Sequence, residues 1–383
     1  MNRRRFNGLL GACALGAPLA SLSGNAHAEN GVDADTIVLG QSCPLTGPAA
    51  ELGTEMRLGA QLYFNEVNQK GGVFGRFIKL TTLDDGYEPD RAAANTRKLI
   101  EEEKVFALFG YVGTPTSNAA LPLFTKAQVP FFGAFTGAES LRNPFNRNIF
   151  NIRASYFDET EKIVEQLTNL GIRKIAVLYQ NDAYGQAGLA GVNRAIAKRQ
   201  MKLVAQGTVE RNTVAVDGAV KTLVPAQPDV IIMISAYKSI AAFVKASKKA
   251  GYVGLFHNVS FVGSRALASE LGKEGHGVAI SQVVPFPYAT AIPVVREYRT
   301  ALKAGSSADV SFTSLEGYIA AKVFVEGLRR AGRDLTRDKL IAAFETMRMV
   351  DFGGFNINFT PTDHNGSNFV ELTIVGRDNN FIH

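Results

Sequence analysis

From residue 36 the chain alternates short apolar runs with segments whose apolar residues recur at helical spacing, and it does so in two series. In the first series, strand-like runs cover residues 36–42, 77–85, 105–110 and 129–135. In the second, they cover residues 173–180, 201–210 and 229–235. Alternation at this period favours parallel sheets with right-handed crossovers. The sequence therefore predicts an α/β fold with two doubly wound parallel-sheet lobes.

The length and the C-terminal part of the chain fit this division. A chain of 383 residues is too long for one ordinary core and suits two lobes. After residue 284 come three helix-like stretches, in residues 291–303, 314–331 and 336–347. Two strand-like segments, FNINFT and NFVELTIVGR, complete the chain.

The first 28 residues have the pattern of an export signal. MNRRRF supplies a basic start, a short apolar stretch follows, and Ala26-His27-Ala28 is a small-x-small cleavage site. We expect cleavage after Ala28. The arginines also fit the twin-arginine pattern, so the choice of export route stays open. An alternative is lipoprotein processing at Cys13, although the apolar run before it is very short.

The net charge bears on possible partners, and the cysteine content bears on disulfides. The formal net charge is +6, and the first 28 residues hold three Arg and no acid, which leaves +3 after cleavage. Without a basic run or aromatic-basic alternation, nucleic acid is not an expected partner. Cys13 leaves with the signal and Cys43 remains alone, so we expect no internal disulfide and a structural thiol at a strand end.

The usual signs of catalysis are missing from the sequence. The five His show no metal-ligand spacing, and there is no G-x-S-x-G, no P-loop and no G-x-G-x-x-G after a strand. The Gly-rich stretch GKEGHG has no preceding strand and no following helix, so it predicts a turn. We expect no enzyme activity and no cofactor.

Small polar residues follow the strands of the first series, where open α/β sheets bind ligands. The hydroxyl cluster TPTS begins at Thr114 and predicts a helix N-cap, and its hydroxyls and free N–H groups also suit a carboxylate. After the strand VPFF, Phe135, Thr136 and Gly137 offer a hydroxyl and a backbone that a ligand can approach closely. The alternative is an ordinary Gly-rich turn.

In the second series, Asp182 and Tyr184 follow one strand and Tyr237 follows another. Asp182 is expected to be the N-cap of the helix that follows it. A tyrosine presents a ring with a polar tip, and two of them after strand ends suit a wall that closes over a ligand.

An ordered set of segments resembles the periplasmic solute-binding proteins of ABC importers, of the leucine/isoleucine/valine-binding type. The matching segments are CPLTGPAAELG, LGAQLYFNEVNQKGGVFG, LDDGYEPDRAAANTRKLI, GYVGTPTSNAALPLF, QNDAYGQAG and FVGSRALASELG. The resemblance implies the type I periplasmic binding protein fold, with lobes joined by a three-segment hinge near residues 151, 284 and 352. The implied N-terminal lobe is 33–151 plus 285–352, and the C-terminal lobe is 152–284 plus 353–383.

The resemblance also implies site residues. Thr114 matches the hydroxyl that receives the ligand carboxylate, and residues 135–137 match a segment that contributes backbone groups and a hydroxyl. Tyr184 and Tyr237 match the aromatic residues of the second lobe, and Leu52 stands where amino-acid binders often carry a Tyr.

Two departures bear on the ligand. Amino-acid binders place an acid near Val262 or Gly263, opposite the ligand ammonium, and this chain has none there. A buried ammonium without a counter-charge costs several kcal/mol. The loop disulfide of some relatives is also absent, because Tyr87 and Gly113 occupy those places.

The implied function is that of an exported, periplasmic protein, expected to be a monomer, that binds a small carboxylate ligand by hinge closure and delivers it to an ABC permease. A branched-chain amino acid and an aromatic or other organic acid both remain open as the ligand. The alternative is a two-lobe sensor of the same fold that signals to a partner protein.

Overall fold

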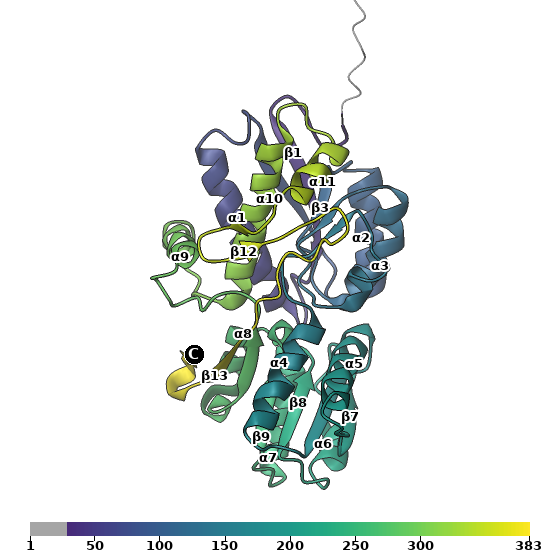
Figure 1. Ribbon diagram of the computed structural model, residues 1–383, viewed down its shortest axis with the longest axis vertical. Coiled ribbons are helices and arrows are strands. Elements are labelled where there is room, and N and C mark those ends of the chain that lie inside the picture. The colour runs from purple at the N-terminus through teal and green to yellow at the C-terminus, as the bar shows by residue number, and fades with distance from the viewer. Residues whose placement is uncertain (1–28) are drawn as a thin grey trace, which may run out of the picture.

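The computed structural model describes residues 29–383 and shows two α/β lobes, stacked along the long axis in Figure 1. The predicted signal segment lies outside the described residues. The first lobe has a five-stranded sheet in which every neighbouring pair is parallel, in the order β2-β1-β3-β4-β5. Its strands are β1 (Thr36–Cys43), β2 (Phe77–Asp84), β3 (Ala107–Phe109), β4 (Phe131–Phe132) and β5 (Ile149–Phe150).

Helices from two distant parts of the chain complete this lobe. They are α1 (Ala50–Gln69), α2 (Pro89–Glu101), α3 (Thr114–Lys126), α9 (Pro293–Gly305), α10 (Phe312–Ala331) and α11 (Arg337–Glu345). The helices α9, α10 and α11 correspond to the three helical stretches predicted after residue 284. α10 packs closely on α1 (Figure 1), because glycines stand where the two helices touch. A Cβ on Gly59 would lie 1.7 Å from the Ser314 carbonyl oxygen, and one on Gly317 would lie 2.2 Å from that of Met56.

The second lobe has a seven-stranded sheet in the order β14-β13-β10-β9-β8-β6-β7. Its strands are β6 (Ile175–Gln180), β7 (Ala205–Val209), β8 (Val230–Ile234), β9 (Leu255–Asn258), β10 (Ala279–Gln282), β13 (Glu371–Val375) and β14 (Phe381–Ile382). β6 to β10 pair in parallel, whereas β13 and β14 add an antiparallel edge. The apolar run of β8 is buried at every residue, as expected for a central strand covered on both faces.

Along the chain, the first helix of this lobe precedes β6 and the other four connect successive strands from β6 to β10. The helices are α4 (Tyr156–Asn169), α5 (Ala183–Ala197), α6 (Asp217–Leu223), α7 (Tyr237–Lys249) and α8 (Ser264–Leu271). Asp182 caps α5 as predicted, since its carboxylate accepts from the N–H groups of Tyr184 and Gly185. The cap fixes the first turn of α5, and with it the position of Tyr184.

The chain crosses between the lobes after β5, after β10 and again before β13. Before the third crossing, β11 (Val350–Asp351) pairs with β12 (Asn356–Ile357). Phe359 then packs against Phe150 and Phe344 of the first lobe, and the Gly366 N–H donates to the Asn151 carbonyl. We therefore propose that the third crossing follows Gly366, later than the predicted position near residue 352.

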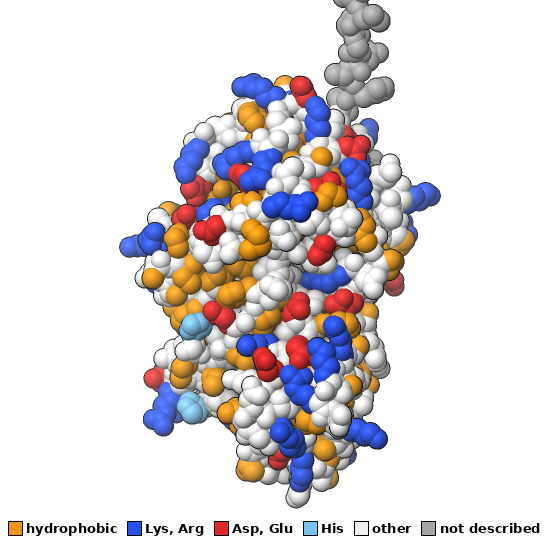
Figure 2. Space-filling view, in the orientation of Figure 1, with side chains coloured by type: hydrophobic (Ala, Val, Ile, Leu, Met, Phe, Trp, Pro, Cys, Tyr) orange, Lys and Arg blue, Asp and Glu red, His pale blue; other side chains and the backbone are white. Residues whose placement is uncertain are grey.

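The surface in Figure 2 carries Lys and Arg side chains interspersed with Asp and Glu over both lobes. Within residues 29–383, no helix is both long and apolar enough to cross a membrane. Cys43 is a free, buried thiol at the end of β1, which confirms its predicted place, and burial raises its pKa well above the usual value.

Candidate functional site

The predicted site residues lie just beyond the carboxyl ends of strands, where the two lobes face each other. Leu52 follows β1, Thr114 follows β3, and residues 135–137 follow β4. In the second lobe, Tyr184, Tyr237 and Gly263 follow β6, β8 and β9. All eight residues are buried.

The two threonines of the first lobe are joined by a hydrogen bond. Thr114 Oγ1 lies 2.7 Å from Thr136 Oγ1, and the Thr136 hydroxyl donates to the Tyr156 hydroxyl oxygen at 3.2 Å. The expected side-chain N-cap is wrong, because Gly113 holds the N-cap position of α3 with φ +99° and no side chain caps this helix. The Thr114 hydroxyl is therefore turned to the neighbouring strand end and not to its own helix.

The turn after β4 is shaped by close contact with the first crossing segment. A Cβ on Gly137 would lie 2.7 Å from the Tyr156 nitrogen, which donates to the Gly137 carbonyl at 2.7 Å. Phe135 is buried, and its ring lies 5.4 Å from that of Phe261 and 4.8 Å from the Arg153 guanidinium carbon. The Gly at 137 thus permits the backbone approach that brings Tyr156 beside Thr136.

The two tyrosines of the second lobe have different surroundings. Tyr184 packs within its own lobe, against Tyr156 at 5.4 Å and against Phe261 at 4.5 Å between ring centroids, whereas Tyr237 reaches the first lobe. The Tyr237 hydroxyl accepts from the Glu51 N–H at 3.5 Å. Burial raises the pKa of Tyr184 well above its usual value and that of Tyr156 to about 12, so both remain neutral hydroxyls.

The lobes are in direct contact, as in a closed binding protein. A Cβ on Gly263 would lie 2.4 Å from Leu52 Cδ2, so these two predicted residues touch across the interface. The Gln180 amide also donates to the Tyr87 hydroxyl at 3.3 Å. The structure therefore brings the candidate residues of the first lobe and those of the second lobe together at one interface.

Two arginines of the second lobe form ion pairs with the first lobe at the rim of this interface. Arg265 of α8 lies 2.7 Å from Glu51 and 2.8 Å from Glu55 of α1. At a second point of the rim, Arg211 lies 2.8 Å from Glu88. These pairs could not be predicted from the sequence, since each joins segments far apart in the chain.

Sequence reasoning also missed several aromatic residues of this interface. Tyr87, Tyr156 and Phe261 are buried, and Phe261 contacts the rings of Tyr87, Phe135 and Tyr184. Phe261 follows β9 and Tyr87 follows β2. The expectation that site residues come just after strands, applied to every strand, would have found both. Tyr156 does not follow a strand of its lobe but begins α4, after the first crossing segment. Only its hydrogen bond with Thr136, seen in the structure, marks it as a residue of this interface.

The loop around Val262 has no acid of its own in the sequence, but a buried acid from another element lies beside it. The buried carboxylate of Glu159, on α4, accepts from the Ser260 N–H at 2.7 Å in the same loop. It also accepts from the Ser281 hydroxyl and lies 3.4 Å from Arg153 Nη2. The acid beside this loop is thus already paired within the protein.

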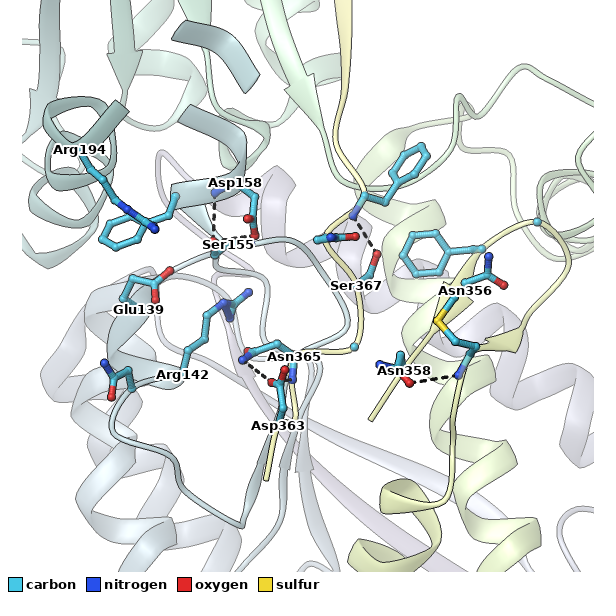
Figure 3. Close-up of a pocket in the computed structure, with 18 residues that line it drawn as sticks. Glu139, Arg142, Ser155, Asp158, Arg194, Asn356, Asn358, Asp363, Asn365 and Ser367 are labelled. Carbon is cyan, nitrogen blue, oxygen red and sulfur yellow. Dashed lines mark hydrogen bonds between the residues drawn. The ribbon is translucent and has the colours of Figure 1, made fainter. Parts of the chain in front are cut away.

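A separate hollow lies where the first and third crossing segments pass each other (Figure 3). Its volume is about 770 Å³, and none of the predicted ligand-binding residues lines it. Arg142, Asp158, Asn358 and Asn365 are among its lining residues, so its wall is mostly polar. In the described part of the chain, no group of three or more His, Cys, Asp or Glu is placed to hold a metal ion.

Comparison with known proteins places the chain in a family. The profile of the periplasmic binding protein family matches residues 36–378, so the chain belongs to this family, which is one of ligand-binding proteins. Several of its relatives are named for the binding of leucine, isoleucine and valine. Leu/Ile/Val-binding protein homolog 7 of Brucella abortus (strain 2308) is 27% identical over 309 residues, which cover 77% of each chain.

Solved structures agree with the fold. A possible leucine/isoleucine/valine-binding protein from Rhodopirellula baltica SH 1 has a TM-score of 0.88 at 36% identity, covering 92% of this chain and 97% of its own. A substrate-binding periplasmic protein from Ralstonia solanacearum has a TM-score of 0.85 at 32% identity, covering 90% and 99%. The predicted two-lobe, type I periplasmic binding protein fold is confirmed.

Proposed function

We propose that this protein is an exported, periplasmic solute-binding protein that closes its lobes on a small carboxylate ligand and delivers it to an ABC permease. The observation that supports this most directly is the Thr114–Thr136 hydroxyl pair, buried at adjacent strand ends and faced by aromatic residues of the other lobe. Residues 1–28 would act as the export signal, with cleavage after Ala28.

The two threonine hydroxyls would hold the carboxylate with uncharged donors. The free N–H groups at the start of α3 would add to this, because a helix N-terminus favours negative charge. Leu52, Phe135, Tyr184 and Tyr237 would surround the apolar remainder, with the backbone at Gly137 and Gly263 close to the ligand. A pocket of this kind is mostly apolar with a few placed polar groups.

Closure follows from contacts that the ligand makes with both lobes. A ligand shifts a conformational equilibrium only by its difference in affinity for the two states. A molecule held by Thr114 on one lobe and by Tyr184 on the other gains its full contacts only in the closed form. The chemistry is recognition and release, without a reaction, so we infer that the protein is not an enzyme.

Relatives named for leucine, isoleucine and valine make a branched-chain amino acid one candidate ligand. The lack of an acid at Val262 and Gly263, and the pairing of Glu159 within the protein, favour an acid without an ammonium group. The buried aromatic side chains suit an aromatic acid equally well.

Mass spectrometry of the small molecules that copurify with the protein, followed by calorimetry, tests the proposal. We expect a carboxylate that is recovered unchanged after incubation. Thr114→Ala should weaken its binding by about 1–3 kcal/mol, whereas Thr300→Ala, on the exposed face of α9, should not. Turnover of the ligand, or no affinity for any carboxylate, would contradict the proposal.

A further inference from the structure

A fully buried arginine lies at the edge of the proposed site. Arg153 belongs to the first crossing segment, between β5 and α4, and its side chain has no exposed surface. Its Nη2 lies 3.4 Å from Glu159 Oε1 and donates to the Ser260 hydroxyl. Its Nη1 lies 3.5 Å from Glu316 Oε1, on α10 of the other lobe.

Part of this guanidinium lacks hydrogen-bond partners. Neither Nε nor Nη1 donates a hydrogen bond to any of residues 29–383, and both atoms are buried. The Tyr184 hydroxyl is also buried and without a partner in the described chain. Buried polar groups in native proteins are nearly always paired with protein, water or ligand. Three buried donors without hydrogen-bond partners at one interface therefore point to a molecule that binds there.

Aromatic contacts connect these donors to the threonine pair. The Arg153 guanidinium lies over the ring of Phe135, the neighbour of Thr136. Tyr184 packs on Tyr156, whose hydroxyl accepts from Thr136. Arg153 and Tyr184 thus adjoin the proposed carboxylate position from the first crossing segment and from the second lobe.

The charges around Arg153 leave this end of the site rich in donors. Glu159 is already paired with Arg153, Ser260 and Ser281. Burial raises the pKa of Glu316 to about 7, although Arg153 opposes this shift, so Glu316 is protonated in a large fraction of molecules at neutral pH. A protonated Glu316 is a donor and leaves Arg153 and Glu159 as a neutral pair.

We propose that Arg153 and Tyr184 form a second polar contact of the site, which binds an oxygen acceptor on the ligand. This inference rests on the proposed function and narrows its substrate class. The ligand is a carboxylic acid with a second oxygen, as in an oxo, hydroxy or dicarboxylic acid, and without an ammonium group. An ammonium would meet the positively charged guanidinium of Arg153, from whose N–H groups it could not accept.

Calorimetry with matched acids tests this, on protein freed of copurified ligand. For the carbon skeletons of leucine and phenylalanine, the panel compares the unsubstituted acid, the amino acid, the oxo acid, the hydroxy acid and a dicarboxylic acid of similar length. We expect at least one oxygen-bearing acid to bind about tenfold tighter than both its unsubstituted and its amino counterpart.

Two variants assign the preference to residues. Tyr184→Phe removes a hydroxyl that has no partner in the described chain, so the fold should survive, and Arg153→Lys keeps the charge while removing the guanidinium N–H groups. Each should reduce the preference to about threefold or less, with a smaller effect on the unsubstituted acid. Tyr252→Phe is the control, because this hydroxyl donates to Leu255 away from the site.

The outcomes separate this inference from the proposed function. Equal binding of unsubstituted and oxygen-bearing acids would overturn the role of Arg153 and Tyr184 while leaving a carboxylate-binding protein. Tightest binding of the amino acids, or an unchanged preference in both variants, would overturn it as well. Failure of every acid to bind would remove the proposed function itself.

Discussion

The hydroxyl oxygens of Thr114 and Thr136 lie 2.7 Å apart, and neither side chain is exposed. The two residues are separated by 22 positions in the chain and meet because β3 and β4 are parallel neighbours whose carboxyl ends share one edge of the sheet. In the proposed complex both hydroxyls donate to one carboxylate. Their energetic effects should therefore depend on each other.

A double-mutant cycle measures this dependence. Thr114→Ala and Thr136→Ala should each weaken ligand binding by about 1–3 kcal/mol, and the double variant should lose less than the sum. Thr114→Ser keeps the hydroxyl and should retain most of the affinity. Additive losses in calorimetry would show that the two residues do not share one group of the ligand.

The Arg265 pairs should favour the closed form. Because Arg265 is about 30% exposed, solvent screens its pairs with Glu51 and Glu55, and Arg265→Ala should weaken binding by only about 0.5–1 kcal/mol. The effect should shrink at high salt. Arg330→Ala is a matched control, because Arg330 pairs with Glu326 inside α10 at similar exposure. Equal losses in both variants would mean that the Arg265 pairs have no part in closure.

Gly263→Ala should hinder closure. The new Cβ would lie 2.4 Å from Leu52 Cδ2 of the other lobe, a clash that exists only when the lobes are in contact. We expect weaker ligand binding, partly restored when Leu52→Ala is added. Gly277→Ala has a similar positive φ and open space around it, so it controls for backbone strain. If both alanine variants bind alike, the contact between Leu52 and Gly263 does not matter for closure.

Glu316 should make stability depend on pH. Its pKa is raised from the usual 4.5 to about 7 by burial, so between these values the folded state binds more protons than the unfolded state. The free energy of unfolding should then fall as the pH rises through this window. Relative to wild type, Glu316→Gln should gain about 1–3 kcal/mol by pH 8.

Denaturant titrations of both proteins from pH 4 to pH 8 measure this gain. Glu326→Gln, on the same helix and partly exposed, is the control. A difference between Glu316→Gln and wild type that does not change with pH would contradict the assignment.

Local patterns predicted much of the fold and placed the candidate residues at one interface. The helix and strand segments follow from apolar periodicity, and the Asp182 cap follows from its position before a helix. The expectation that site residues come just after strands placed Thr114, Thr136, Tyr184 and Tyr237 at one interface because it depends only on the direction of parallel strands.

Features that depend on how the lobes meet could not be predicted in this way. The partner of Thr114 is a strand neighbour and not its own helix, and Gly113 became the N-cap because its positive φ suits the turn. Nothing in the sequence distinguishes Arg153 from the other arginines of the chain. Only the packing of α4 and α10 around it shows that it is buried between two carboxylates.

Small-angle X-ray scattering with and without ligand tests directly whether the lobes close on the bound molecule. We expect protein freed of ligand to be more extended, and the copurifying carboxylate to shift its scattering to that of the closed arrangement, with Leu52 against Gly263 and Arg265 against Glu51. Superimposable scattering curves in the two states, at ligand concentrations that saturate binding, would contradict it.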